Sequence, residues 1–167
     1  MAKDNASPGS RVIVVGDPGD ELMQTTVRLA REREIDAVPC ENVYAAVVAL
    51  AQAAGRHVLV VGQIKELAGE NGAFFGIVTA HAACCCCLLD KSSPAGQENL
   101  LMALRVGVTI LGRAPDVRGV LAEWLAAPGP REARRRARDA SHAQRHAWEE
   151  TCEDLRATEE ELSALLG

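Results

Sequence analysis

Short runs of β-branched residues alternate with longer segments of helical periodicity from Arg11 to Ala127, and this alternation constrains the fold more than any other feature of the chain. Apolar runs bounded by turn residues are typical of buried strands. They lie at 11–16, 35–40, 56–63, 84–90 and 108–112, and helices are predicted after them at 20–34, 42–55, 72–83, 96–107 and 115–127. Five β-α units in this order predict an α/β fold, a (βα)5 doubly wound parallel five-stranded sheet with helices on both faces.

Residues at the ends of these elements refine the prediction. The run at 56–63 is almost wholly apolar, which favours a central strand, whereas Pro39 favours an edge or a strand end for the run that contains it. Asn42 is expected to cap the second helix, and Pro115 is expected to open the last one. The segment 64–71 is predicted to be a polar loop.

The composition narrows the class of protein. Aromatic residues make up 3% of the chain and its net charge is −5, so the core is expected to be aliphatic and nucleic acid is not an expected partner. The first ten residues lack the apolar segment of a secretory signal, and the longest apolar run is about half of the ~18 residues that span a bilayer. We therefore expect a cytoplasmic protein without membrane contact, whose cysteines are reduced.

The chain is expected to have four parts. Residues 1–10 are predicted to be a disordered N-terminus, and 11–127 to form the α/β domain. Residues 128–130 read as a Pro/Gly linker. The remaining residues, 131–167, contain no proline and no glycine before the last position, which predicts one long charged C-terminal helix.

This C-terminal helix has a segregated charge pattern. Arginines dominate 131–145 and acids dominate 149–161. Two copies laid antiparallel would place the basic half of one beside the acidic half of the other. A short a/d-type seam runs through the acidic half, formed by Trp148, Leu155, Leu162 and Leu165. The pattern favours a coiled-coil dimer or partner helix, and equally a single helix that folds back on its own domain or projects into solvent.

Four consecutive cysteines, Cys84 to Cys87, fall in the fourth predicted strand. Successive strand residues point to opposite faces, so Cys84 and Cys86 are expected to face one helix layer, and Cys85 and Cys87 the other. Four adjacent thiols in a strand do not converge tetrahedrally on one Zn²⁺. We interpret the run as packing by small apolar side chains and predict no metal site.

Two further segments resemble the receiver domain of two-component response regulators. "VIVVGDPGDEL" resembles the first strand and acidic loop of receivers, and "LMALRVGVTILGRAPDVRGVLAEWL" resembles their C-terminal segment. The resemblance covers about 117 of 167 residues, from 11 to 127. It implies a flavodoxin-like fold and, in an active receiver, an aspartate that accepts a phosphoryl group at the end of the third strand.

The resemblance also implies that the phosphorylation site is degenerate. Gly62 stands where the phosphoacceptor would fall, and a glycine cannot form an acyl phosphate. Of the paired acids after the first strand only Asp17 remains, and one carboxylate is a poor Mg²⁺ site. Asp90 or the nearby Ser92 would occupy the hydroxyl position, and Arg113 replaces the lysine after the fifth strand.

Other candidate sites are weaker. The loop Gly16–Asp20 stands where a phosphate cradle could form, but its two acids would repel a phosphate, so a turn with Asp20 as N-cap is the favoured interpretation. His142 and His146 lie four apart on the predicted C-terminal helix without a third ligand, and we predict no metal there.

These observations lead to three hypotheses of function. The first is a non-catalytic pseudo-receiver that needs no cofactor and acts by contact with a protein partner or a second copy, aided by the C-terminal helix. The alternative is a flavodoxin-like domain that binds a small molecule or nucleotide at the carboxyl ends of the strands. The third, and least favoured, is a receiver that is phosphorylated on Asp17 or Asp90.

Overall fold

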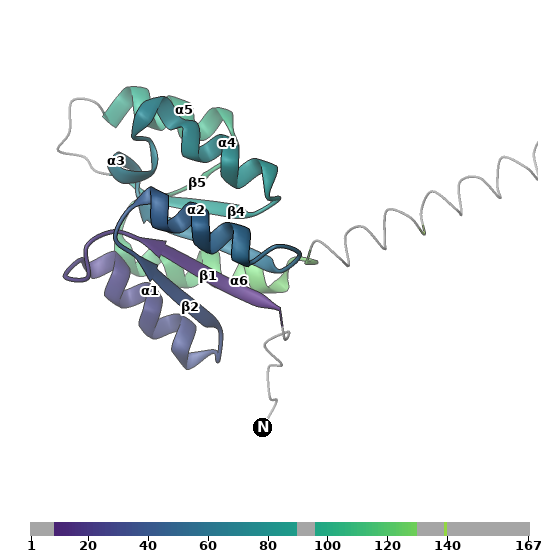
Figure 1. Cartoon of the computed structure of the whole chain (residues 1–167). Helices are drawn as coiled ribbons and strands as arrows, with labels where there is room; N and C mark the ends of the chain where they lie inside the picture. The colour runs from purple at the N-terminus through teal and green to yellow at the C-terminus, as the bar shows by residue number, and fades with distance from the viewer. Residues whose placement is uncertain (1–8, 90–95, 130–138, 140–167) are drawn as a thin grey trace, which may run out of the picture. The chain divides into compact units, whose positions relative to one another are not determined.

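Five parallel strands form one sheet in the order β2-β1-β3-β4-β5 (Figure 1). The computed structural model describes residues 9–89, 96–129 and Asp139. The strands in these ranges are β1 (Ser10–Val15), β2 (Asp36–Cys40), β3 (His57–Gln63), β4 (Cys84–Leu88) and β5 (Thr109–Leu111). The predicted α/β doubly wound parallel sheet is confirmed, and its strand order is that of flavodoxin-like folds.

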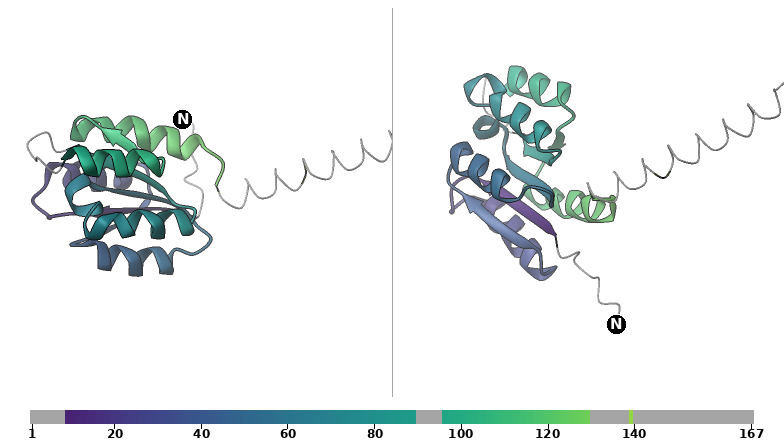
Figure 2. Two further views of the ribbon diagram at one scale, coloured as in Figure 1. Left: turned by 90° about the horizontal axis from the view of Figure 1, so that it is seen from above. Right: turned by 45° about the vertical axis from the view of Figure 1, so that its right-hand side comes forward.

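Helices cover both faces of the sheet (Figure 2). They are α1 (Glu21–Glu32), α2 (Val43–Gln52), α3 (Ile64–Leu67), α4 (Ala73–Ala80), α5 (Gly96–Arg105) and α6 (Val117–Ala126), with 3₁₀ turns η1 (Glu70–Gly72) and η2 (Ala114–Asp116). The first and last helices pack on one face through Leu22 and Leu121. The other four pack on the opposite face, so the parallel sheet is buried on both sides.

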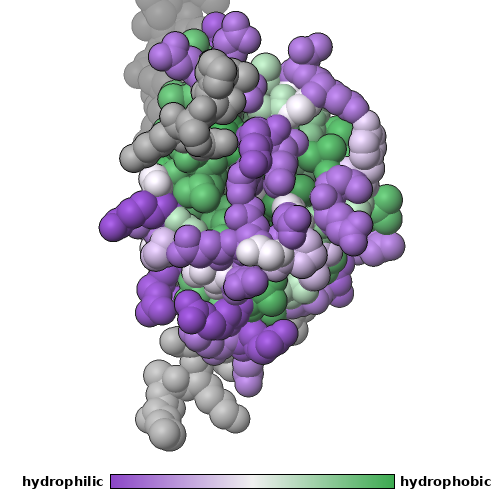
Figure 3. Space-filling view, turned by 90° about the vertical axis from the view of Figure 1, so that its left-hand side faces the viewer, coloured by the Kyte–Doolittle hydropathy of each residue, from purple (hydrophilic) through white to green (hydrophobic). Residues whose placement is uncertain are grey.

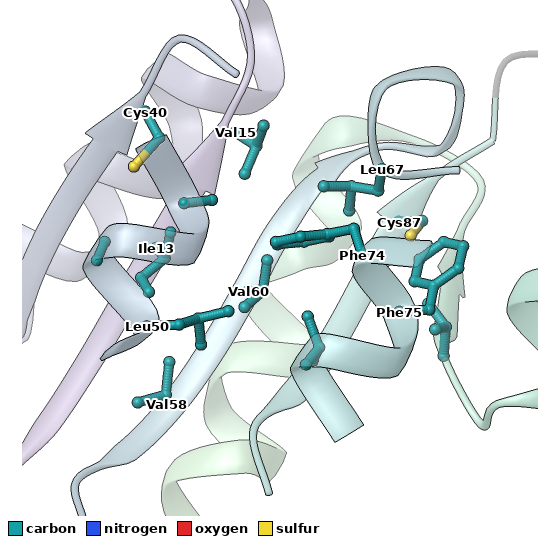
Figure 4. Packing of buried hydrophobic residues seen from close by; sticks show 14 of the residues in the cluster. Ile13, Val15, Cys40, Leu50, Val58, Val60, Leu67, Phe74, Phe75 and Cys87 are labelled. Carbon is teal, nitrogen blue, oxygen red and sulfur yellow. The ribbon is translucent and has the colours of Figure 1, made fainter. Parts of the chain in front are cut away.

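Alternation along the strands divides the core into two layers. Val12 and Val14 of β1 belong to the α1/α6 layer, whereas Ile13 belongs to the layer under α2 and α4. Figure 4 shows that second layer, where Val60 of β3 lies among side chains of the covering helices. Each fully buried aliphatic side chain of this kind stabilises the fold by about 1.5–3 kcal/mol. Burial in the two apolar layers is therefore what binds the helices to the two faces of the sheet.

Several predictions about element ends are confirmed. The third strand is the central one, and β2, which contains Pro39, is an edge strand. Asn42 caps α2, because its side-chain oxygen accepts the backbone N–H of Ala45 at 3.0 Å. The prediction that Pro115 opens the last helix is wrong, because Pro115 lies in the 3₁₀ turn η2 and α6 begins two residues later at Val117.

The polar loop predicted at 64–71 is wrong. Ile64–Leu67 forms the short helix α3, and both of its apolar residues are buried, Leu67 completely. Spacing by three residues lets Ile64 and Leu67 reach the core from one turn of helix, while Lys65 stays exposed. The charged residues between them hid this pattern in the sequence.

The amino end of β3 is tied to α6 by a ring contact. The rings of His57 and Trp124 are 4.6 Å apart between centroids and tilted by 34°. Burial lowers the pKa of His57 below its ordinary value of 6.5. The indole Nε1 of Trp124 is buried and has no hydrogen-bond partner among the described residues. The contact between His57 and Trp124 therefore stabilises the fold by packing of the two rings and not by a hydrogen bond of the indole.

The C-terminal part of the chain forms a separate unit, residues 131–167, of which only Asp139 is described. The predicted C-terminal helix, its seam of Trp148, Leu155, Leu162 and Leu165, and the His142/His146 pair lie outside the described residues. So does the expected disorder of the first eight residues, whereas Ser10 already belongs to β1. Among the helices of the described ranges, none has the length and apolar character needed to cross a membrane.

Candidate functional site at the carboxyl end of the sheet

The carboxyl ends of β1 and β3 meet where the strand order reverses, which is the usual ligand position in open α/β sheets. The loop Gly16–Asp20 leaves β1 here, and α3 leaves β3. Figure 3 looks onto this end of the sheet, where hydrophilic side chains run through the middle of the face with hydrophobic side chains on both sides. The site predicted from the receiver resemblance is expected in this region.

Gly62, which stands at the expected phosphoacceptor position, is covered by a leucine. A β-carbon added to Gly62 would lie 3.0 Å from Cγ of Leu67 and 3.1 Å from each of its methyl carbons. Leu67 is fully buried, and Figure 4 shows its side chain above the end of the sheet, near Cys87 and Phe74. The space in which an acceptor side chain would begin is therefore filled by packing.

No loop separates β3 from α3. Gln63 is the last residue of the strand and also the N-cap position of the helix, so the chain turns directly from one into the other. This direct turn brings Leu67 back over Gly62 within one turn of helix. The closure of the site is thus encoded in the segment Gln63–Leu67 itself.

Asp17, the remaining acid of the expected pair, is used by its own turn. Its Oδ1 accepts the backbone N–H of Gly19 at 2.8 Å, and its carbonyl oxygen accepts the N–H of Asp20 at 2.9 Å. Aspartate commonly closes a turn in this way. The residue is exposed, and its carboxylate holds the turn.

Asp20 stands at the N-cap position of α1, as expected, but its side chain does not cap the helix. Its Oδ2 instead accepts a hydrogen bond from Nε2 of Gln63. This bond joins the start of α1 to the end of β3, across two elements that are 43 residues apart in sequence. The prediction of a simple N-cap is corrected, because a cross-strand donor competes for the carboxylate.

Glu66 completes a small cluster of carboxylates beside this bond. A β-carbon on Gly16 would lie 3.1 Å from Oε2 of Glu66 and 3.6 Å from Oδ2 of Asp20, so both carboxylates border the same backbone. The Oε2 atom is buried without a hydrogen-bond partner in the described chain. Burial, and then the negative charge of Asp20, raise the pKa of Glu66 above its ordinary value of 4.5.

The cluster does not form a metal centre by its geometry. Within 9–89 and 96–129, no three His, Cys, Asp or Glu side chains are grouped so as to hold a metal ion. Glycine is favoured at position 16 because its φ is +150°, and a β-carbon there would also lie tightly against the Glu66 carboxylate. The cluster packs the β1 loop closely against α3.

The positive charge of Arg113 is paired with Asp116 and is not free to neutralise this cluster. Its guanidinium pairs with Oδ1 of Asp116 at 3.4 Å, and its backbone N–H donates to Oδ2 of the same residue at 3.0 Å. The side chain is 81% exposed. The charge that the sequence predicts after β5 is thus paired within the turn that leads into α6. Asp90 lies outside the described residues.

Three of the four cysteines alternate between the two core layers as predicted. Cys86 belongs to the α1/α6 layer, while Cys87 and the partly buried Cys85 belong to the layer under α2 and α4. The expectation of packing is confirmed for Cys86 and Cys87, which are fully buried. It is wrong for Cys84, which is exposed at the start of the strand.

Cys84 and Cys85 border a cavity of about 230 Å³ at the amino ends of β4 and β5. The other walls come from α4 and from the segment that leads into β5. Burial and the neighbouring Cys85 raise the pKa of Cys84 above 9.0, and a hydrogen bond with Cys87 raises the pKa of Cys85 well above that value. Both groups are therefore thiols near neutral pH and add to the apolar character of the walls.

Three residues of the carboxyl end escaped the sequence prediction. Gln63, Glu66 and Leu67 all lie in or beside the segment that was assigned to a loop. The only available signal was the i, i+3 spacing of Ile64 and Leu67 directly after a strand.

The chain matches no model of a known protein family, no curated protein and no solved structure.

Proposed function

We propose that the chain is a non-catalytic, receiver-like regulatory module that acts through contacts with another protein molecule. The observation that carries this proposal is the packing of Leu67 over Gly62. Phosphoryl transfer to a receiver requires a carboxylate at that position, whereas this position holds no side chain and Leu67 packs tightly against it. In this proposal the domain is a cytoplasmic interaction module that does not depend on phosphorylation.

Exposed apolar side chains support an interaction role. On α5 and just after it, Leu101, Leu104 and Val106 are 58%, 54% and 44% exposed. On α2, Tyr44 and Val48 are 63% and 57% exposed. Large apolar side chains that lie together on a surface, as the i, i+3 pair Leu101 and Leu104 does on α5, are a common mark of protein interfaces. The seam of the predicted C-terminal helix would add a second contact in this proposal.

A small-molecule site at the carboxyl end remains the alternative, and Leu67 takes up the space that it would need above Gly62. Incubation of the full chain with acetyl phosphate and Mg²⁺, read by intact mass, tests the non-catalytic proposal. We expect no phosphorylated species. A stoichiometric increase of one phosphoryl group on an aspartate of this chain would refute the proposal and favour a receiver that uses another acid.

Light scattering after size exclusion, on the full chain and on residues 1–128, tests the contribution of the C-terminal helix. A larger mass for the full chain than for the shorter one would assign an association contact to residues 131–167. Equal association of both chains would place the contact on the α/β domain.

A further inference from the structure

Two neighbouring helices of the domain carry no charged residue. Neither α2 (VYAAVVALAQ) nor α4 (AFFGIVTA) contains Asp, Glu, Lys or Arg, and the two helices are in contact on one side of the sheet. The helices on the opposite face differ, because α1 contains four charged residues and α6 contains Arg118 and Glu123. A surface helix normally presents charged and polar side chains to water, so two adjacent uncharged helices indicate a covered surface.

The exposed side chains of these helices form one stripe on each. On α2 they include Tyr44, Val48 and Ala51, at positions i, i+4 and i+7, and on α4 they include Ala73, Gly76 and Ala80, at i, i+3 and i+7. We call these six residues the α2–α4 face. The residues of this face on α2 include two large side chains, Tyr44 and Val48, whereas those on α4 are all Ala or Gly. Nothing lies within 4 Å of a β-carbon built on Gly76.

Tyr44 is held in place in the free domain. Its hydroxyl donates a hydrogen bond to Oε1 of Glu70 in η1, and this bond is the main cause of the raised pKa of Tyr44. A tyrosine whose ring is already ordered loses little conformational entropy on binding, which makes it a good interface anchor. This bond orients Tyr44 within its own domain.

We propose that the α2–α4 face binds the same face of a second copy of this chain, with the two α2 helices antiparallel about a two-fold axis at Val48. This inference deepens the proposed function, on which it rests, by naming the surface and the partner. In a two-fold contact the residues at the axis meet their own copies, so a charge there would oppose a like charge. An uncharged patch avoids this repulsion.

Side-chain sizes fit this arrangement. With the axis at Val48, residue 45 of one copy faces residue 51 of the other, and residue 44 faces residue 52. The ring of Tyr44 then lies against the small Ala51 and the neutral Gln52 of the second copy, and the two Val48 side chains meet at the axis. Alternating large and small side chains across facing helices is the basis of close helix packing.

The charges that flank α2 also favour an antiparallel pair. Glu41 and Glu70 lie at its amino end, the latter bound to Tyr44. At its carboxyl end Arg56 and Arg11 share the single carboxylate of Asp36, at 3.3 Å and 2.6 Å, which leaves one net positive charge. Antiparallel helices bring the acidic end of each copy to the basic end of the other, and their dipoles oppose.

The same charges argue against an anionic membrane as the occupant, because acidic residues stand at the rim of the face.

The size of the face sets the strength of the contact. Ten residues of α2 span about 15 Å, and two helices about 10 Å apart give a patch of roughly 300 Å². This is less than the ~800 Å² that each partner buries in a standard interface. We therefore expect the dimer to be weak and reversible.

Sedimentation equilibrium of the full chain over a range of concentrations tests the contact. We expect a mass that rises towards twice 17.8 kDa. Val48→Glu, which places two like charges at the axis, and Gly76→Lys, which adds bulk where the free domain has open space, are each expected to raise the dissociation constant at least tenfold. Ala122→Glu, at an exposed position on α6, is the matched control and should leave it within twofold.

Cross-linking identifies the axis directly. In a chain whose Cys84 and Cys152 are replaced by serine, Val48→Cys should form a covalent dimer with a short bis-maleimide, because the two introduced thiols lie at the axis. Gln24→Cys, exposed on α1, should not. A circular-dichroism melt of each variant confirms that the domain is folded.

The outcomes separate this inference from the proposed function. A dimer that persists in Val48→Glu and Gly76→Lys overturns the α2–α4 contact, although a module that associates through another surface survives. A chain that stays monomeric and unlinked, or a chain that binds anionic vesicles through Val48 in place of a second copy, also overturns the contact. Phosphoryl labelling by acetyl phosphate bears on the proposed function alone.

Discussion

Leu67 lies so close over Gly62 that a β-carbon at position 62 would stand 3.0 Å from its Cγ atom. The glycine belongs to the central strand and the leucine to the helix that follows without a loop. Each residue therefore depends on the size of the other, and the pair closes the carboxyl end of the sheet between β1 and β4.

The first prediction concerns this pair. Gly62→Ala should destabilise the domain by about 1–3 kcal/mol, because the added methyl group overpacks against Leu67. Gly119→Ala, at an exposed helical position with open space around it, should instead stabilise it by about 0.5–1 kcal/mol. Urea unfolding followed by circular dichroism measures both.

A double-mutant cycle locates the effect. In a Leu67→Ala background, Gly62→Ala should cost less than in the native chain, because the leucine that it strikes is gone. An equal cost in both backgrounds would show that the methyl group meets something other than Leu67.

The second prediction concerns Glu66. Its pKa is raised in the folded protein, so its neutral form is favoured there, and its contribution to stability is present below pH 4.5 and lost as the pH rises through the folded value. Glu66→Gln, which keeps the shape without the charge, should therefore raise Tm at pH 8 by a few degrees and leave it nearly unchanged at pH 4. A gain of the same size at both pH values would contradict this account of the buried carboxylate.

The third prediction concerns His57, whose pKa is lowered by burial. The unfolded chain binds a proton more readily, so this group's contribution to stability is present above pH 6.5 and is lost as the pH falls towards its folded value. His57→Phe keeps a ring against Trp124 and cannot be protonated. The variant should lose less stability than the native chain between pH 7 and pH 5, as measured by thermal melts, and parallel losses would rule out His57 as the cause.

The fourth prediction concerns the cysteine run. In the folded protein N-ethylmaleimide should modify Cys84, whereas Cys86 and Cys87 should react only after unfolding, because both are fully buried. The raised pKa of Cys84 should make its modification slow at pH 7 and faster towards pH 9. Peptide mapping by mass spectrometry assigns the modified residues. Modification of Cys86 at the rate of Cys84 would show that β4 opens in the native state.

The fold could be predicted from the sequence because each strand has a local sequence signal. Val58 to Val61 form an unbroken β-branched and aliphatic run, and Pro39 marks an edge strand, since proline cannot donate to a neighbouring strand. These signals depend only on the residues of the segment itself. They can therefore be recognised without knowledge of the tertiary structure.

The carboxyl end could be predicted only in part. The absence of an acceptor at Gly62 is visible in the sequence, but the filling of its space by Leu67 depends on the path of the chain five residues later. The bond between Gln63 and Asp20 joins residues 43 apart, and no local pattern indicates which donor an N-cap carboxylate will choose. The α2–α4 face was hidden for a different reason, because uncharged helices look like core until their exposure is known.

The direct passage from β3 into α3 has a consequence for regulation. In a switchable domain a movable segment at this point can adopt two positions, and a covalent mark selects between them. Here Gln63 ends the strand and stands at the N-cap position of the helix, and Leu67 packs over Gly62, so no loop separates the two elements. The self-association proposed above would instead respond to the abundance of the chain, because by mass action the paired fraction rises with concentration.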